Sequence, residues 1–114
     1  MIIELHGLEV FGYHGAYEDE QRDGQDFLYD VELEVGERGA DDRLEGAVDY
    51  TEVAAEISAV NARRYDLLEA LASAVADALM ARFRPESVRV RVRKPGARPA
   101  GLEVDYSAVT VERP

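Results

Sequence analysis

The chain has 114 residues, 46% of them hydrophobic, and a formal net charge of -11 at pH 7. This length predicts one domain, residues 1–114, with a modest core of two packed layers. The acidic balance argues against binding to phosphate backbones, and the absence of cysteine excludes disulfides and thiol chemistry. The N-terminus lacks a basic segment followed by a long apolar run, so we expect neither a signal peptide nor a membrane span, and a cytoplasmic location.

The first two predicted elements are β-strands separated by a long loop. Residues 2–11 are rich in β-formers but contain Gly7, which predicts a strand with a bend. The segment DFLYDVELEV is typical of a half-buried strand, because Phe27, Tyr29, Val31, Leu33 and Val35 point one way while Asp30, Glu32 and Glu34 point the other. The intervening FGYHGAYEDEQRDGQDF is longer than a hairpin requires, and such loops often carry function.

Two helices follow. Asp49 and Glu52 form a possible capping box before Val53, Ile57 and Val60, which recur at helical spacing. Asp66 and Glu69 repeat that start signal before a second apolar stripe, and Pro85 ends the second helix. The residues of this stripe are Leu68, Leu71, Val75, Leu79 and Phe83.

The last two predicted elements are strands again. Val88, Val90 and Val92 alternate with arginines, and GLEVDYSAVTVE gives the final strand, whose parity slips between Tyr106 and Val109 and so predicts a β-bulge. The order of elements predicts an α+β fold: a four-stranded antiparallel sheet with both helices on one face, in the order ββααββ. The acids of one strand and the arginines of another then share the outer face, either solvated or paired between copies of the chain.

Lys94 is the single lysine beside twelve arginines, and strand parity places it on the apolar face with the valines. Burial would lower the pKa of a lysine, whereas an arginine stays protonated. This pattern favours a proton-transfer role for Lys94. The alternative is a lysine that ends the strand before Pro95 and extends to water.

Four other residues have a structural and a functional interpretation. Glu69 either reaches back to cap its helix or, oriented by the helix dipole, binds an amidine-like edge. Glu20 is either a solvated acid or an acid, base or water anchor. His14 has no partner at metal-ligand spacing, so we interpret it as structural, and Tyr50 beside a helix cap is more often packing than catalysis.

Taken together, four segments resemble the dihydroneopterin aldolase family. They are GLEVFGYHGAYEDEQRDGQDFLYDVELEV, DYTEV, DLLEALA and VRVRVRKPGA, which occur in the family's order and spacing over nearly the whole chain. The resemblance implies a tunnelling fold in which subunits form a ring. Two rings would stack into an octamer, with active sites between subunits.

The resemblance also implies the reaction and the roles of residues. The reaction is the retro-aldol cleavage of 7,8-dihydroneopterin in folate biosynthesis, without a cofactor, a metal or a Schiff base. Glu69 would anchor the amino-pyrimidine edge of the pterin beside Leu68, and Glu20 would position water or substrate. Tyr50 would come from across the subunit interface, and Lys94 would move protons.

One departure concerns the substrate. The family commonly runs K-P-x-A-P-I-P-G after the lysine, whereas this chain reads KPGARPAG, with Arg98 and Ala100 where prolines are usual. The resemblance therefore leaves two alternatives open. One is an epimerase, or a bifunctional aldolase and epimerase, acting on dihydroneopterin or its triphosphate; the other is a pterin- or purine-binding ring that has lost catalysis.

Overall fold

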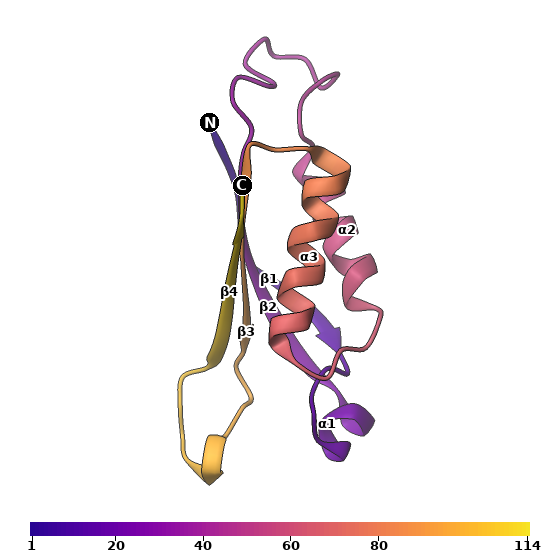
Figure 1. Ribbon diagram of the computed structural model, residues 1–114, viewed down its shortest axis with the longest axis vertical. Coiled ribbons are helices and arrows are strands. Elements are labelled where there is room, and N and C mark those ends of the chain that lie inside the picture. Colours follow the sequence, from indigo (N-terminus) through magenta and orange to yellow (C-terminus); the bar gives the residue numbers. More distant parts are fainter.

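A computed structural model describes all of residues 1–114 as an antiparallel sheet with two long helices against one face (Figure 1). The elements are β1 (Ile2–Gly12), α1 (Glu18–Asp23), β2 (Gln25–Glu34), α2 (Tyr50–Asn61), α3 (Leu68–Phe83), β3 (Ser87–Lys94), the 3₁₀-helix η1 (Pro99–Gly101) and β4 (Ser107–Arg113). The strands lie in the order β1-β2-β3-β4, which confirms the predicted α+β fold and leaves β1 and β4 as edges. No helix combines the length and the apolar character needed to cross a membrane.

The hydrophobic core lies between the inner face of the sheet and the helices. α2 contacts β1, and α3 contacts β3 and β4. The alternating apolar residues of β2 and β3 are buried, and so are four of the five residues of the predicted α3 stripe, Leu71, Val75, Leu79 and Phe83. Burying each such side chain stabilises the fold by about 1.5–3 kcal/mol. Periodicity therefore predicted the inner surface of both layers.

The bend in β1 occurs at the predicted place. The register between β1 and β2 shifts between Leu5 and Leu8. Gly7 has a φ of +69°, a left-handed conformation that favours glycine. Its amide turns away from the ladder and donates to Asp30 Oδ1 at 2.8 Å. The glycine thus bends the strand and binds an acid of the neighbouring strand.

The predicted bulge in the last strand is absent, so that prediction was wrong. β4 pairs with β3 in unbroken register, from Ser107 opposite Lys94 to Arg113 opposite Val88. Tyr106 precedes the strand and therefore does not follow its parity. The slip in the sequence pattern marks the start of β4, not an inserted residue.

The two helix starts differ from each other. Asp49 caps α2 as predicted, because its carboxylate accepts a hydrogen bond from the Thr51 amide at 2.9 Å. α3 instead begins at Leu68 without a side-chain cap, and Asp66 pairs with Arg64 at 2.6 Å. The predicted Asp66 cap is therefore wrong. The Asp66 carboxylate accepts from the neighbouring Arg64 guanidinium and not from the amides at the start of α3.

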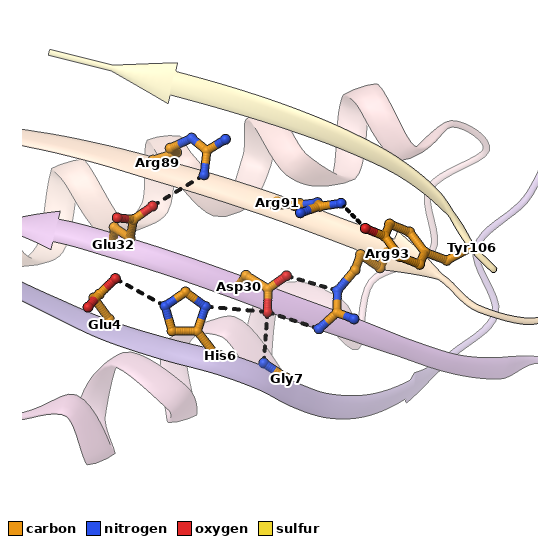
Figure 2. A network of polar contacts seen from close by, with 9 residues as sticks. All are labelled: Glu4, His6, Gly7, Asp30, Glu32, Arg89, Arg91, Arg93 and Tyr106. Carbon is orange, nitrogen blue, oxygen red and sulfur yellow. Dashed lines mark hydrogen bonds and ion pairs between the residues drawn. The ribbon is translucent and has the colours of Figure 1, made fainter.

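The outer face of the sheet carries a network of paired charges (Figure 2). The guanidinium of Arg93 donates to both oxygens of Asp30, at 2.8 and 3.0 Å. His6 lies 3.1 Å from Glu4 and 3.7 Å from Asp30. We call these side chains and their neighbours the outer-face network: Glu4, His6, Asp30, Glu32, Arg89, Arg91, Arg93 and Tyr106.

The same network extends along β3. Arg89 lies 3.3 Å from Glu32, directly opposite it in the register. Arg91 donates to the Tyr106 hydroxyl, and the guanidinium groups of Arg91 and Arg93 both lie over the Tyr106 ring. Two of the three arginines of β3, Arg89 and Arg93, therefore pair with acids of β2 within one chain, as cross-strand neighbours of opposite charge are expected to do.

Candidate active site

The candidate site is a cavity of about 860 Å³ at one end of the sheet. It lies where β1 leads through α1 into β2, and where β3 leads through η1 into β4. Figure 1 shows both connections beyond the same end of the strands. Glu20, Leu68 and Lys94 line this cavity, as three of the five residues proposed from the sequence. Its volume is within the range typical of small-molecule sites, about 300–1,000 Å³.

An ion pair joins Lys94 and Glu20, two of the titratable residues that line the cavity. Lys94 Nζ lies 2.5 Å from Glu20 Oε2, and the two side chains are only 13% and 19% exposed. Lys94 ends β3 on the side of the buried valines, as parity predicted. The sequence indicated both residues, separated by 74 positions, but not their contact. A charge-assisted hydrogen bond of this kind orients both partners.

The backbone before α1 leaves room for the Glu20 carboxyl group. A Cβ at Gly15 would lie 2.5 Å from that group, and Gly15 has a φ of +152°. The Tyr17 amide faces Glu20 Oε1 at 3.4 Å. Gly15 is therefore required by close approach as well as by backbone conformation. The stretch expected to be a loop contains the short helix α1, which sequence reasoning missed.

Glu69 is the second residue of α3, in its first turn, and is exposed. Its carboxylate makes no hydrogen bond or ion pair within the chain, so the interpretation of Glu69 as a capping residue finds no support. Leu68, its neighbour, lines the cavity. An acid at a helix N-terminus is stabilised by the helix dipole, and this one remains available to a ligand.

Tyr50 lies apart from the other four residues. It is the first residue of α2, and 62% of it is exposed, so it does not pack into the core. α2 has 12 residues and is about 18 Å long. Figure 1 shows α2 beginning at the end of the molecule away from α1 and η1. Within one chain, Tyr50 and the cavity are therefore separate.

The lining of the cavity also includes residues that sequence reasoning missed, among them Tyr17, Gln25 and Ser107. Tyr17 precedes α1, Gln25 opens β2, and Ser107 opens β4 opposite Lys94. Antiparallel pairing places Ser107 beside Lys94, a neighbour that could have been found from a correct register. The predicted bulge shifted the expected register there, so the pairing of Ser107 with Lys94 was not predicted.

His14 is structural, as predicted, and lies behind the site at 1% exposure. Its Nδ1 accepts from the Tyr65 amide at 3.0 Å, and its Nε2 lies 3.0 Å from Asn61 Oδ1. Asn61 also accepts from the Tyr29 hydroxyl at 2.6 Å and donates to the Phe11 carbonyl at 2.8 Å. We call this group the buried network.

Burial lowers the pKa of His14, and the hydrogen bond with Asn61 opposes that effect only in part. The ring is thus held neutral, and because Nδ1 accepts a hydrogen bond, Nε2 carries the proton. Burial also raises the pKa of the Tyr29 phenol, which keeps that group a donor. Every buried side-chain nitrogen and oxygen of the chain has a hydrogen-bond partner.

Comparison with known proteins identifies the family. The family model for dihydroneopterin aldolase matches residues 3–112. The chain belongs to the dihydroneopterin aldolase family. The dihydroneopterin aldolases of Methylorubrum extorquens and Streptomyces coelicolor are 37% and 38% identical to it, over 97% of this chain and over 88% and 95% of the relatives.

Solved structures of dihydroneopterin aldolases have the same fold. The Escherichia coli enzyme in complex with neopterin superposes with a TM-score of 0.91 at 29% identity, over 100% of this chain and 99% of that one. The Burkholderia thailendensis enzyme bound to guanine has a TM-score of 0.81 at 27% identity, over 99% and 89% of the two chains. The resemblance found in the sequence is confirmed.

The departure from the dihydroneopterin aldolase pattern lies in the loop beyond Lys94. Arg98 lines the cavity and lies 3.6 Å from Glu103, with both side chains largely exposed. Ala100 has a φ of +55°, a left-handed conformation that costs a non-glycine residue about 1–2 kcal/mol. The loop therefore places an exposed cation, Arg98, and a strained alanine, Ala100, at the rim of the cavity.

Proposed function

We propose that this chain is a lyase that cleaves 7,8-dihydroneopterin by a retro-aldol reaction in folate biosynthesis. The products are 6-hydroxymethyl-7,8-dihydropterin and glycolaldehyde. Membership of the dihydroneopterin aldolase family supports the reaction. The observation that carries the proposal is the part-buried pair of Lys94 and Glu20 in a cavity large enough for a pterin. The neopterin and guanine bound to relatives support a bicyclic heterocycle as ligand.

The reaction breaks a carbon–carbon bond and needs an acceptor for the electron pair. The imine of the dihydropterin ring serves as that acceptor and becomes an enamine. A base removes the proton of the 2'-hydroxyl as the bond breaks, and an acid then protonates the enamine carbon. The substrate thus supplies its own electron sink, and we propose that neither a metal nor a Schiff base takes part.

Lys94 and Glu20 are suited to the proton transfers. Lysine can gain and lose a proton, whereas the guanidinium of arginine stays charged. Lys94, an ordered water or Tyr50 would relay the hydroxyl proton, and Glu20 would orient that water or the substrate. Proton transfer by positioned groups contributes roughly 10²- to 10⁴-fold. Orientation of the substrate would supply much of the remaining rate enhancement.

Glu69 would fix the position of the pterin ring. Its carboxylate is free within the chain and is exposed next to Leu68 of the cavity wall. A carboxylate can accept two parallel hydrogen bonds from the amino-pyrimidine edge of a pterin. Glu69→Gln should therefore weaken pterin binding first, with Glu112→Gln on the far outer face as a control. Equal affinity in wild type and Glu69→Gln would contradict this role.

We further propose that each site is completed by a neighbouring subunit in a ring of four, with two rings forming an octamer. Two observations support this. The edge strands β1 and β4 are unpaired in one chain, and Tyr50 is exposed at the end of the molecule away from the cavity. Pairing of edges between copies would close the ring and bring Tyr50 of one chain to the cavity of another.

Incubation with 7,8-dihydroneopterin, followed by separation of the products, tests the reaction. Equimolar 6-hydroxymethyl-7,8-dihydropterin and glycolaldehyde are expected. Dihydromonapterin without glycolaldehyde would instead identify an epimerase, and tight pterin binding with no product would identify a binding protein. Borohydride added during turnover should trap no adduct on Lys94.

The role of Lys94 is tested by its replacement with arginine, which keeps the charge and removes the proton transfer. Turnover should be lost while pterin affinity stays nearly unchanged. Arg89→Lys is the matched control, because it makes the opposite exchange on the outer face. Unchanged turnover in Lys94→Arg would exclude the proton-transfer role.

A complementation experiment tests the shared site. Lys94→Ala and Tyr50→Phe should each be inactive alone. Unfolding and refolding them together should restore about a quarter of the wild-type sites, because Lys94 and Tyr50 of one site would then come from different chains. A mixture with no more activity than its components, or a monomeric mass in light scattering, would contradict the shared site.

A further inference from the structure

His14 connects two segments that are far apart in the sequence and that both reach the candidate site. It lies between β1 and α1, and its Nδ1 accepts from the backbone amide of Tyr65, 51 residues along the chain. Its Nε2 is bonded to Asn61 at the end of α2, and its ring packs edge-on against Phe27 at 4.9 Å between centroids. The imidazole is thus bonded at both nitrogens and packed against an aromatic ring.

The first segment leads directly to Glu20. Gly15, the residue after His14, donates its amide to the Tyr65 carbonyl at 3.0 Å. The carbonyl of Gly15 accepts from Gln21 Nε2 at 3.0 Å, within α1. The Glu20 carboxyl group lies against the Gly15 Cα, so closely that a Cβ there would be 2.5 Å away. The backbone that supports the Glu20 carboxyl group is therefore that of Gly15, the residue directly after His14.

The second segment leads to the other wall of the cavity. Tyr65 lies three residues before Leu68, where α3 begins, and Glu69 follows Leu68. The Tyr65 amide donates to His14 and the Tyr65 carbonyl accepts from Gly15, and these two bonds join this turn to the loop that carries Glu20. Hydrogen bonds behind the site therefore connect the Glu20 side of the cavity with the Leu68 side.

The chemistry at His14 requires a neutral imidazole. The Tyr65 amide faces Nδ1 and needs an acceptor there. Asn61 is oriented by its bond to the Phe11 carbonyl, so its Oδ1, which also accepts from the Tyr29 hydroxyl, faces Nε2 and can only accept from it. A neutral histidine offers one acceptor and one donor on opposite sides of a rigid ring. A protonated ring has two donors and would face the Tyr65 amide with the wrong group.

We propose that His14 is a positioning residue: its neutral imidazole, held by Tyr65 and Asn61, sets where the Glu20 carboxylate lies relative to Leu68 and Glu69. It touches no substrate and acts through Gly15. This inference rests on the proposed function for its kinetic consequences. Its structural consequence, the ordering of residues 15–24, stands independently of that function.

Three variants separate the two hydrogen bonds. His14→Phe keeps a ring and loses both bonds. His14→Asn places its amide oxygen near the wild-type position of Nδ1 and so keeps the bond from the Tyr65 amide. His14→Gln places its amide nitrogen near the wild-type position of Nε2 and so keeps only the bond to Asn61. We expect His14→Phe to lower kcat roughly tenfold to a hundredfold, since misplacement of a reacting group by about 1 Å costs that much. KM should change less than about threefold because Glu69, on the core helix α3, still anchors the pterin.

The conservative variant and a stability control distinguish positioning from folding. His14→Asn should recover most of the kcat that His14→Phe loses. Val75→Ala, in the core of α3, should lower the melting temperature similarly without lowering kcat when assayed well below its unfolding transition. The proposal would be overturned by an unchanged kcat in His14→Phe, by failure of His14→Asn to recover it, or by an equal loss in Val75→Ala.

Amide hydrogen exchange without substrate gives a readout that does not depend on the reaction. We expect His14→Phe to speed exchange in residues 15–24 while the centre of α3 keeps its protection. If wild type fails to cleave dihydroneopterin, the proposed function fails and this measurement still tests the inference. Unchanged exchange over residues 15–24 in both His14→Phe and His14→Gln would overturn it.

Discussion

The two histidines of this chain lie in networks on opposite sides of one sheet. His14, in the buried network, is 1% exposed and bonded at both ring nitrogens. His6, in the outer-face network, has a side chain that is 58% exposed and lies between two acids (Figure 2). Both networks join segments that are distant in sequence. The two networks differ in their access to water. On the outer face, water can replace a lost hydrogen-bond partner, whereas in the buried network it cannot.

This difference decides what each network can contribute. In the buried network, removal of one group leaves others unpaired in a dry environment, at about 1–3 kcal/mol for each orphaned group. On the outer face, an exposed ion pair contributes about 0–1 kcal/mol. Variants that test this ranking are compared at one protein concentration, because assembly would add to the apparent stability.

The largest expected effect is that of Asn61→Leu, which keeps the size of the side chain and removes all its polar atoms. It leaves His14 Nε2, the Tyr29 hydroxyl and the Phe11 carbonyl without their bonds to Asn61, while His14 Nδ1 keeps its bond from the Tyr65 amide. We expect the free energy of unfolding, measured by urea denaturation, to fall by about 3 kcal/mol. Tyr29→Phe, which leaves Asn61 still bonded to His14, should cost only about 1 kcal/mol. Equal costs for the two variants would show that the network does not act as a unit.

Asp30→Ala should have the largest effect on the outer face. Asp30 is the most enclosed acid there, with a side chain that is 14% exposed, and it binds both Arg93 and the Gly7 amide. Burial raises its pKa, but the bonds from Arg93 and Gly7 outweigh burial and lower it. We expect a loss of about 1–2 kcal/mol in the free energy of unfolding. A loss above that of Asn61→Leu would reverse the proposed ranking.

The pH dependence of stability should have opposite signs for the two histidines. Burial holds the pKa of His14 below its ordinary value of 6.5. Its stabilising contribution is therefore present above pH 6.5 and lost as the pH falls towards the pKa of the folded state. The hydrogen bond with Glu4 raises the pKa of His6 above 6.5, so its contribution is present at lower pH and lost as the pH rises through that pKa.

Urea denaturation between about pH 5 and pH 8 checks these signs. The stability difference between wild type and His14→Asn should shrink as the pH falls, by at most about 1.4 kcal/mol per pH unit. The difference between wild type and His6→Gln should shrink as the pH rises, and by less because His6 is exposed. A wild-type advantage over His14→Asn that is independent of pH would contradict the neutral, buried imidazole.

The smallest effect is expected for Arg89→Ala. Its guanidinium pairs with Glu32 at 3.3 Å and with Glu112 at 3.2 Å, but the side chain is 48% exposed. We expect less than about 1 kcal/mol, decreasing further in high salt, because water and ions screen such pairs. A larger loss in the free energy of unfolding that does not depend on salt, measured in the isolated subunit, would show that Arg89 is less accessible to solvent than its exposed fraction indicates.

The elements of the fold were largely predictable, because their signals are local. Alternation in β2 and β3 and the stripe of α3 follow directly from which residues must avoid water. Start signals were less reliable. Asp49 caps its helix, but Asp66, with the same spacing to a glutamate, pairs with Arg64 because the guanidinium is near enough to compete.

The site was predictable only in part. Parity placed Lys94 on the inner side of the sheet, and the family resemblance indicated Glu20, Leu68, Glu69 and Tyr50. The roles of these five residues, the octamer and the cytoplasmic location stay predictions. No pattern in the sequence pairs Lys94 with Glu20 or Tyr65 with His14, since each contact depends on how strands and turns are brought together over more than 50 positions.

The sequence by itself determined the class of fold, the inner face of each element and the family, since each follows from the order and spacing of side chains along one chain. Tertiary structure alone decided the contact between Lys94 and Glu20, the separation of Tyr50 from the cavity and the buried network around His14. These depend on distances between segments, and a hydrogen bond forms only when its two atoms approach to about 3 Å.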